Sequence, residues 1–162
     1  MPVQSDKAEC FRALHAETFV IANAWDAGSA RILTALGFKA LASSSGACAG
    51  VLGRRDGMVT RDETLAHCKA IVDATDLPVS ADLEKGFGNS PRAAADTIRL
   101  AVHVGLVGGS IEDATGDPAR PRFDPAHAAA RIQAAAAAAR ALPFPFTLTA
   151  RTENYLHGNP SL

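Results

Sequence analysis

Residues 80–91 read SADLEKGFGNSP and join the end of one structural element to the beginning of another. The apolar residues 77–79, LPV, predict the beginning of a buried strand, and Ser90 followed by proline predicts the N-cap and first turn of a helix. Asp82 and Glu84 stand at the end of that strand, where two carboxylates are costly unless something pairs with them. The stretch therefore predicts a strand-to-helix connection with polar chemistry at the carboxyl end of the strand.

The same alternation of strand and helix runs along the chain. Predicted strands are residues 18–24, 38–43, 79–83, 108–111 and 146–150; predicted helices are 26–37 (caps included), 61–75, 91–104 and 124–142, with a glycine-containing loop through 46–57. Such alternation predicts a parallel sheet with crossover helices, either an open doubly wound sheet or a (β/α)8 barrel. No G-x-G-x-x-G follows the first strand, which argues against an open nucleotide-binding sheet.

The length of the chain limits how much of a barrel it can form. Its 162 residues predict a single domain, residues 1–162. We count about four strand–helix units and a fifth strand, whereas a complete (β/α)8 barrel needs about 250 residues. We therefore expect an α/β chain that forms part of a (β/α)8 TIM barrel and is truncated after about the fifth strand.

Composition argues against several classes of protein. The chain has 16 basic and 17 acidic residues and a formal net charge of −1, so electrostatics favour neither nucleic acid nor an anionic membrane as a partner. The N-terminal residues lack the apolar segment of a signal peptide, and no apolar run approaches the roughly 20 residues of a membrane span. The three cysteines have no C-x-x-C spacing, which argues against a disulfide framework or a zinc site and predicts a reducing cytoplasm.

The carboxyl ends of the predicted strands carry polar side chains, and α/β folds gather their functional groups at these ends. Asp82 and Glu84 are two residues apart, so on a strand they point to the same face, and Glu112 ends the next strand. Three converging carboxylates repel one another unless a cation lies among them, and a site with only oxygen ligands favours Mg²⁺. The alternative is that these acids cap the following helices or face solvent.

Other strand ends offer groups for an anionic ligand. Residues 43–46, SSSG, supply hydroxyls and backbone N–H groups that suit a carboxylate or phosphate, although many such loops are only turns. Arg151 could form a bidentate clamp on an anion, or an ion pair with one of the acids. Asp56 lies in a glycine-flanked loop, as in a mobile lid, while charged loop residues are usually just solvated. Asp26 is most simply an N-cap.

Five motifs of the chain resemble the isocitrate lyase / phosphoenolpyruvate mutase superfamily, in its phosphoenolpyruvate mutase-like branch. They are NAWDAGSA (23–30), the strand end SSSG (43–46), SADLEKGFGN (80–89), SIEDA (110–114) and LTARTEN (148–154), in the order and spacing of that superfamily. The resemblance implies a (β/α)8 barrel, usually in a homo-oligomer, that binds Mg²⁺ and a small 2-oxo acid or other carboxylate. It also implies the making or breaking of a C–C or P–C bond through an enolate-like intermediate.

The strand ends and the resemblance together assign roles to individual residues. The resemblance maps Ser45 and Gly46 to the substrate-binding pair and Asp56 to the acid of a gating loop. The predicted metal ligands are Asp82, Glu84 and Glu112; the predicted substrate-binding residues are Trp25, Ser44, Ser45, Gly46 and Arg151; and the predicted catalytic residues are Asp56, Glu112 and Arg151.

The chain departs from the superfamily pattern after residue 113. Isocitrate and methylisocitrate lyases carry a Lys-Lys/Arg-Cys-Gly-His loop there, whereas residues 114–123 read ATGDPARPRF, with neither cysteine nor histidine. The lysine and asparagine of the mutase and phosphonopyruvate hydrolase gating loops are also absent. We therefore expect an Mg²⁺-dependent lyase, hydrolase or mutase acting on a small 2-oxo acid. The alternative is a catalytically inactive fragment or scaffold of this family.

Overall fold

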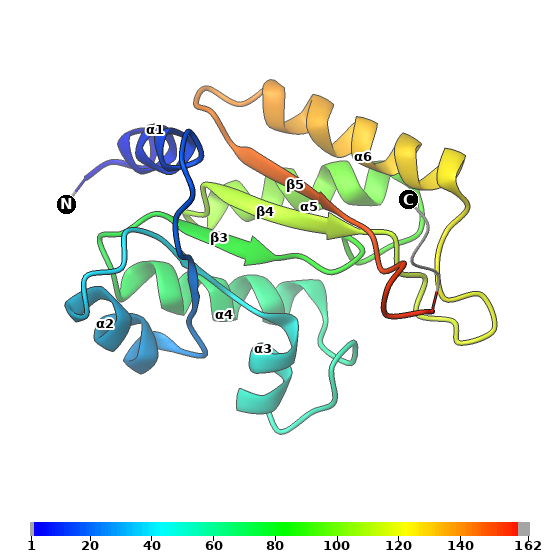
Figure 1. The fold of residues 1–162 in the computed structure, drawn as a ribbon, viewed down its shortest axis with the longest axis horizontal. Helices are drawn as coiled ribbons and strands as arrows, with labels where there is room; N and C mark the ends of the chain where they lie inside the picture. The colour runs from blue at the N-terminus through cyan, green and yellow to red at the C-terminus, as the bar shows by residue number, and fades with distance from the viewer. Residues whose placement is uncertain (1, 159–162) are drawn as a thin grey trace.

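The computed structural model describes residues 2–158, in which helices and strands alternate (Figure 1). The elements are α1 (Gln4–Leu14), β1 (Ala22–Asn23), α2 (Ala27–Ala35), β2 (Leu41–Ala42), α3 (Ser45–Val51), α4 (Arg61–Asp73), β3 (Val79–Asp82), α5 (Pro91–His103), β4 (Gly108–Glu112), α6 (Pro125–Arg140) and β5 (Thr147–Arg151). No helix of this described part has the length and apolar character needed to cross a membrane.

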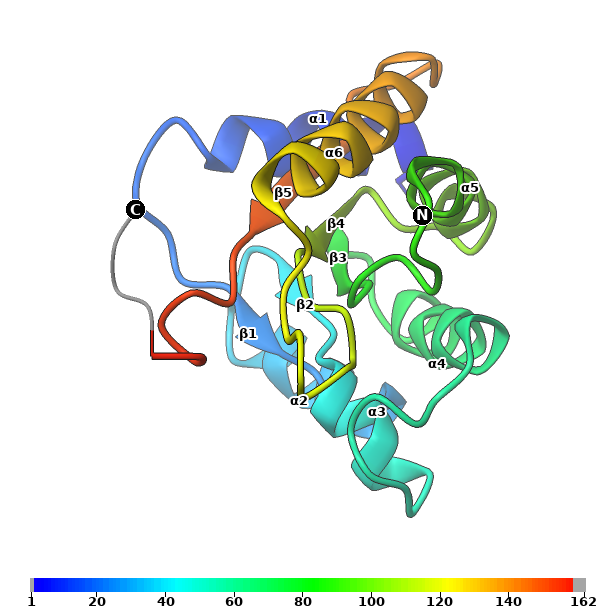
Figure 2. The ribbon, with the colours of Figure 1, turned by 90° about the vertical axis from the view of Figure 1, so that its right-hand side faces the viewer.

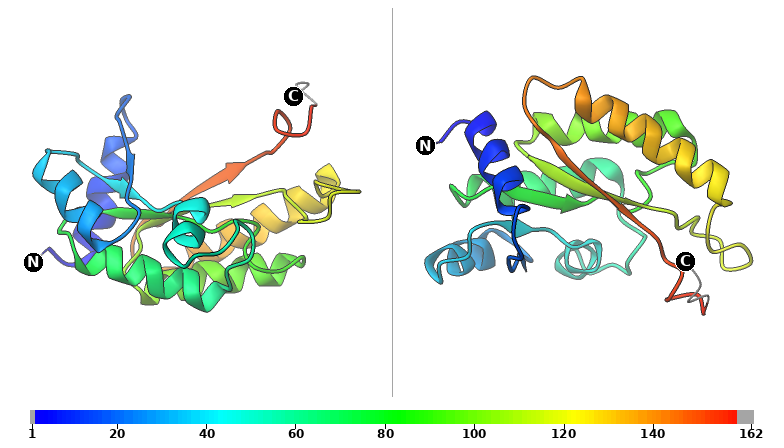
Figure 3. Two further views of the ribbon diagram at one scale, coloured as in Figure 1. Left: turned by 90° about the horizontal axis from the view of Figure 1, so that it is seen from below. Right: turned by 45° about the horizontal axis from the view of Figure 1, so that its top comes forward.

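The five strands form one parallel sheet in the order β1-β2-β3-β4-β5. This sequential order is that of a (β/α)8 barrel, because a doubly wound sheet reverses its strand order. Seen from the side in Figure 2, α4, α5 and α6 follow one another around one face of the sheet. β1 and β5 are the two edges, and the turn of residues 154–158 lies beyond β5 (Figure 3). The expected part of a TIM barrel, up to its fifth strand, is confirmed.

The central strands divide their side chains between two faces, as the two-residue period of a strand requires. On β3, Val79 and Ala81 are buried in one apolar cluster with Ile98 of α5. Asp82 alternates with them and points to the opposite face, and its neighbour in register on β4 is Ser110. The apolar half of the pattern therefore faces the helices, and the polar half leads to the carboxyl edge of the sheet.

Helix α1, which was not expected from the sequence, covers the N-terminal end of the sheet. Gln4 donates from Nε2 to two backbone carbonyls at the end of α5 and just after it, each at 2.9 Å. Phe11 packs so close to Gly108 of β4 that a Cβ at this glycine would lie 2.7 Å from the ring. Only Ala8 and Phe11 of the helix are buried, so its apolar pattern is too sparse to stand out in the sequence.

The prediction of a loop was wrong over residues 45–51, where the structure has helix α3. Ser44 caps this helix, since its Oγ accepts a hydrogen bond from the backbone N–H of Ala47 at 3.4 Å. The side chains of Ala47, Cys48 and Ala49 are buried. Tertiary packing of these small side chains stabilises the helix despite its glycines, which are poor helix formers.

Most of the other helices begin at the capping residues predicted from the sequence. Ser90 and Asp124 cap α5 and α6, and each accepts a hydrogen bond from a backbone N–H of the first turn, which also contains a proline. Asp26 caps α2 in a reciprocal capping box with Ser29, which confirms the N-cap predicted from the sequence. β1 and β2 have two residues each and are shorter than the predicted strands.

Candidate active site

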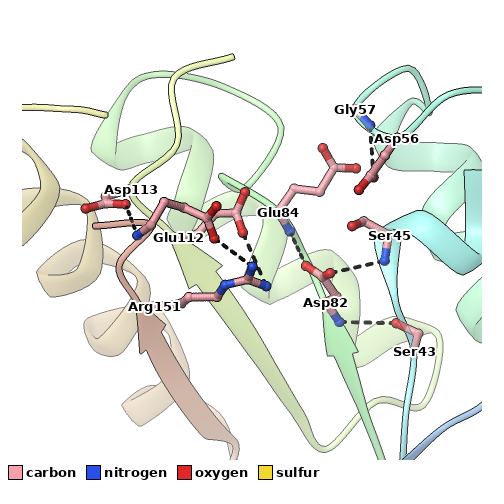
Figure 4. A network of polar contacts seen from close by, with 10 residues as sticks. Ser43, Ser45, Asp56, Gly57, Asp82, Glu84, Glu112, Asp113 and Arg151 are labelled. Carbon is pink, nitrogen blue, oxygen red and sulfur yellow. Dashed lines mark hydrogen bonds and ion pairs between the residues drawn. The ribbon is translucent and has the colours of Figure 1, made fainter. Parts of the chain in front are cut away.

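Asp82, the last residue of β3, is held by hydrogen bonds from two loops (Figure 4). Its Oδ2 accepts from the backbone N–H of Ser45 at 3.1 Å, and its Oδ1 accepts from the backbone N–H of Glu84 at 3.0 Å. Its own backbone N–H donates to Oγ of Ser43 at 3.1 Å. Hydrogen bonds from backbone donors to both oxygens fix the orientation of the carboxylate. Asp82 is therefore the rigid centre of the acidic site.

Glu84 follows Asp82 in a left-handed backbone conformation, with φ at 49°, which is uncommon for a residue other than glycine. Burial, together with the negative charges of Asp56 and Asp82, raises the pKa of Glu84 to about 7, against the opposing effect of Lys85. The side chain of Asp56 lies on the facing loop, with its Oδ2 3.6 Å from the position that a Cβ on Gly46 would take. The structure thus brings the predicted lid residue next to Glu84.

Glu112 and Arg151 are neighbours in register at the ends of β4 and β5. Arg151 places Nη1 3.8 Å from Oε2 of Glu112 and Nη2 2.7 Å from Oε1 of Glu153. Burial raises the pKa of Glu112 to about 7, helped by the charges of Glu153 and Asp82 and opposed by Arg151. The ion pair that the sequence left open as an alternative role for Arg151 is therefore present.

Asp113 and Glu153 belong to the same network, although they are not among the site residues predicted from the sequence. Oδ2 of Asp113 accepts from the hydroxyl of Thr152 at 2.8 Å, and its Oδ1 accepts from the backbone N–H of Glu153 at 2.9 Å. The side chain of Glu153 is only 9% exposed. The signal that could have revealed these residues is their position next to Glu112 and Arg151, in the motifs SIEDA and LTARTEN.

The acids have the donor chemistry of a hard-cation site. Among residues 2–158, no three His, Cys, Asp or Glu side chains lie close enough together to form a ready-made metal cluster. The pKa values of Glu84 and Glu112 are nevertheless both raised, because the two side chains are half-buried beside other carboxylates. A cation among them would remove that repulsion. Mg²⁺ suits this arrangement, since it takes few carboxylates and keeps several waters; the three residues as direct ligands remain a prediction.

The other predicted site residues lie around this centre in different ways. Ser45 and Gly46 adjoin Asp82 and Asp56, as described above. The hydroxyl of Ser44 is the cap of α3. Trp25 follows β1 and is 59% exposed, and its backbone carbonyl lies 2.7 Å from Nε2 of a histidine on α4. The structure therefore brings Ser45 and Gly46 to the acids, while substrate binding by Ser44 and Trp25 stays a prediction.

Two hollows open beside the acids. One, of about 480 Å³, lies between the loop that leads into α4 and the residues Glu84, Lys85 and Phe87. The other, of about 1020 Å³, is lined mainly by residues 113–125 and by Thr152. The second hollow is lined largely by the segment between β4 and α6, where the sequence departs from the expected pattern. Both are large enough for a small carboxylate.

The family model described as phosphoenolpyruvate phosphomutase matches residues 11–162. The 2-methylisocitrate lyase of Escherichia coli (strain K12) is 34% identical over 93 residues, which are 56% of this chain and 31% of the lyase.

Solved structures cover almost the whole chain. A protein of Burkholderia cenocepacia J2315, described as a lyase/mutase, has a TM-score of 0.96 and 54% identity, over 99% of this chain and 58% of that one. Oxaloacetate acetylhydrolase in complex with its product oxalate has a TM-score of 0.86 and 26% identity, over 98% of this chain and 57% of that one.

This chain spans 46% of one curated relative and 31% of another, so it corresponds to less than half of either protein. Within that span, the sequential parallel sheet and the acidic carboxyl edge agree with the match of the family model. The chain belongs to the phosphoenolpyruvate phosphomutase family, within the phosphoenolpyruvate mutase/isocitrate lyase superfamily.

Proposed function

We propose that this chain carries the Mg²⁺-binding and substrate-binding part of an enzyme that makes or breaks a C–C or P–C bond next to the carbonyl group of a small 2-oxo acid. The observation that carries the proposal is the carboxylate of Asp82, held by two backbone N–H groups at the carboxyl edge of the sheet. Glu84 and Glu112 have pKa values raised to about 7, and the negative charge of Asp82 contributes to both shifts.

Asp82, Glu84 and Glu112 would hold the metal ion, directly or through water. Mg²⁺ bound there would supply Lewis acidity to the carbonyl of the 2-oxo acid, where negative charge develops as the bond breaks. The protein's contribution is to present the acids in a fixed geometry. The hydrogen bonds to Asp82 serve that purpose, because they hold the carboxylate before any ligand arrives.

Arg151 would bind the carboxylate of the substrate or the leaving group. Its guanidinium is permanently charged and matches a carboxylate with two parallel hydrogen bonds. In the structure it is partly exposed and engaged by Glu112 and Glu153, so a ligand would compete with these two acids for it. The backbone N–H of Ser45 already donates to Asp82, so we assign substrate contact to the hydroxyl of Ser45 and to Gly46.

Asp56 would act from a loop that closes over the bound substrate and excludes water. The loop joins α3 to α4, and Gly53 and Gly57 on either side of Asp56 both have positive φ angles, 67° and 76°. Asp56 also accepts a hydrogen bond from the backbone N–H of Gly57 at 3.0 Å. Glycines at such positions let a loop change its conformation at little steric cost.

The substrate class rests on relatives. The E. coli relative is a 2-methylisocitrate lyase, and the oxaloacetate acetylhydrolase structure holds its product oxalate. Both names point to small carboxylates. The different loop at residues 114–123 supports a substrate other than that of the cysteine-containing lyases.

Titration calorimetry tests the proposal directly. We expect the protein to bind Mg²⁺, and to bind oxalate, an analogue of pyruvate enolate, only when Mg²⁺ is present. Asp82→Asn should lose both, whereas Asp76→Asn, the same change at an exposed position close to β3, should keep both. If the unmodified protein binds neither ligand, the alternative of a catalytically inactive fragment or scaffold is favoured instead.

A further inference from the structure

The loop between β3 and α5 holds Glu84 in an unfavourable backbone conformation. Glu84 and Phe87 have positive φ angles of 49° and 55°, although neither is a glycine, and Gly86 between them has 77°. Side chains with a Cβ disfavour this region of φ. Such a loop persists only when surrounding contacts hold it in place.

Those contacts come from side chains of α5 and α6 that bind the carbonyl groups of the loop. Arg131 of α6 donates from Nη1 to the carbonyl of Gly88 at 2.7 Å and from Nη2 to the carbonyl of Lys85. Thr97 of α5 donates from its hydroxyl to the carbonyl of Gly86 at 2.8 Å. The two helices thus bind three carbonyls within four residues, directly after Glu84.

Arg131 is the central group of this arrangement. It is 1% exposed, and within the described residues no ion pair involves it, so a charged group is buried with carbonyls as its hydrogen-bond acceptors. The ring of Phe123 lies against it, with its centroid 4.4 Å from Cζ of the guanidinium. A buried charge is costly, and an apolar side chain could fill the same space at lower cost. Its presence therefore calls for a role that an apolar side chain could not perform.

Phe123 connects Arg131 to the segment that follows β4, the strand that carries Glu112 at its end. It belongs to the segment between β4 and α6, and β4 ends in Glu112. The carbonyl of Glu84 also accepts a hydrogen bond from the backbone N–H of Glu112 at 3.0 Å. One guanidinium thus contacts both the loop that follows β3 and the loop that follows β4.

We propose that Arg131 is a positioning residue: it locks the β3–α5 loop in the conformation that presents Glu84 beside Asp82, and so sets the affinity of the acidic site for Mg²⁺. The metal part of this inference rests on the function proposed above. The locking of the loop does not, because it concerns contacts within the protein alone.

Hydrogen exchange of the metal-free protein tests the lock. Lysine in the variant Arg131→Lys keeps the charge but cannot hold two separate carbonyls with a planar fork. We expect the amides of Glu84 and Gly86, which donate to Asp82 and to the carbonyl of Leu83, to exchange faster by on the order of tenfold. Amides in the middle of β4 should change less. Arg140→Lys, the same substitution at an exposed position of α6, should leave the exchange rates of the loop amides and of the β4 amides unchanged.

Calorimetry with Mg²⁺ tests the consequence for the site. Loss of residues that orient metal ligands weakens metal binding by about 10–100-fold, and we expect Arg131→Lys to fall in that range. A lower melting temperature, with unchanged loop exchange and unchanged Mg²⁺ affinity, would make Arg131 an ordinary core residue and overturn the inference. If Arg131→Lys does not fold, Phe123→Leu provides a second test, because it removes only the aromatic ring against the guanidinium. Phe123→Leu should also speed exchange of the loop amides and weaken Mg²⁺ binding, each to a smaller degree. Unchanged exchange of the loop amides in Phe123→Leu would overturn the lock.

Failure of the two proposals can be told apart. If the unmodified protein does not bind Mg²⁺, the proposed function and the metal part of this inference are both overturned. The exchange of the Glu84 and Gly86 amides still decides whether Arg131 locks the loop.

Discussion

The backbone N–H of Ser45 lies 3.1 Å from Oδ2 of Asp82, across 37 positions of the sequence. This hydrogen bond attaches the first residue of α3 to the last residue of β3. Because the donor is a backbone group, it is present whatever side chain stands at position 45, except proline. The orientation of Asp82 therefore depends on α3, a helix that the sequence did not predict.

Removing that single donor should weaken Mg²⁺ binding. Ser45→Pro deletes the N–H at the first position of a helix, where proline is tolerated, and the extended backbone of Ser44 (φ −138°, ψ 137°) suits a residue before proline. We expect the Mg²⁺ affinity to fall by about tenfold, measured by calorimetry.

The control for this change is Ser45→Ala, which keeps the N–H and deletes only the hydroxyl. It should retain the Mg²⁺ affinity and weaken the Mg²⁺-dependent binding of oxalate. Equal Mg²⁺ affinities in the proline and alanine variants would show that the hydrogen bond does not support the site.

Glu84 should make the metal-free protein less stable as the pH rises. Its pKa is raised from 4.5 to about 7 in the folded protein, so the folded state binds this proton more tightly than the unfolded state does. The resulting stabilisation is fully present below about pH 4.5 and is lost as the pH rises through about 7. Thermal unfolding of the metal-free protein between about pH 4.5 and 8 measures the effect.

Comparison with variants isolates the contribution of Glu84 from that of other titrating groups. Glu84→Gln should flatten part of the pH dependence, whereas Glu17→Gln, at an exposed position, should leave it unchanged. Saturating Mg²⁺ should also reduce the dependence in the unmodified protein, since a cation favours the ionised acid. Parallel curves for the unmodified protein and Glu84→Gln would argue against a raised pKa at this residue.

Substitution by alanine should have opposite effects on the stability of the protein at two of its glycines. At Gly108 an added Cβ would lie 2.7 Å from the ring of Phe11 and 3.0 Å from the carbonyl oxygen of Thr147, so we expect a loss of about 1–3 kcal/mol in the free energy of unfolding. At Gly50, within α3, a Cβ would meet nothing within 4 Å, and alanine should be neutral or stabilise by up to about 1 kcal/mol. Denaturant unfolding measures both, and a stable Gly108→Ala variant would contradict the close packing of α1 on β4.

Arg151 should matter for the carboxylate ligand more than for the metal. Arg151→Lys keeps the charge but loses the planar pair of donors, so oxalate affinity in the presence of Mg²⁺ should fall by about tenfold or more. The affinity for Mg²⁺ alone should change less, because lysine keeps the positive charge beside Glu112 and Glu153. Calorimetry measures both, and unchanged oxalate binding would remove Arg151 from the substrate site.

The local features of the fold could be predicted from the sequence because neighbouring residues determine them. Asp26, Ser90 and Asp124 act as helix caps through atoms three residues away. The alternation of apolar strands with helices predicts a parallel sheet, and the general rule for such folds places Asp82 and Glu112 at the same edge.

The sequence by itself determined the fold class, the family and the acidic edge of the sheet, since these depend on periodicity, capping and motif order along the chain. Only the tertiary structure decided which groups meet there. The contact of Ser45 with Asp82, the pairing of Arg151 with Glu112, and the hold of Arg131 on the loop after Glu84 each join residues at least 37 positions apart. Such contacts depend on how helices and strands pack, and packing depends on side chains distributed over the whole chain.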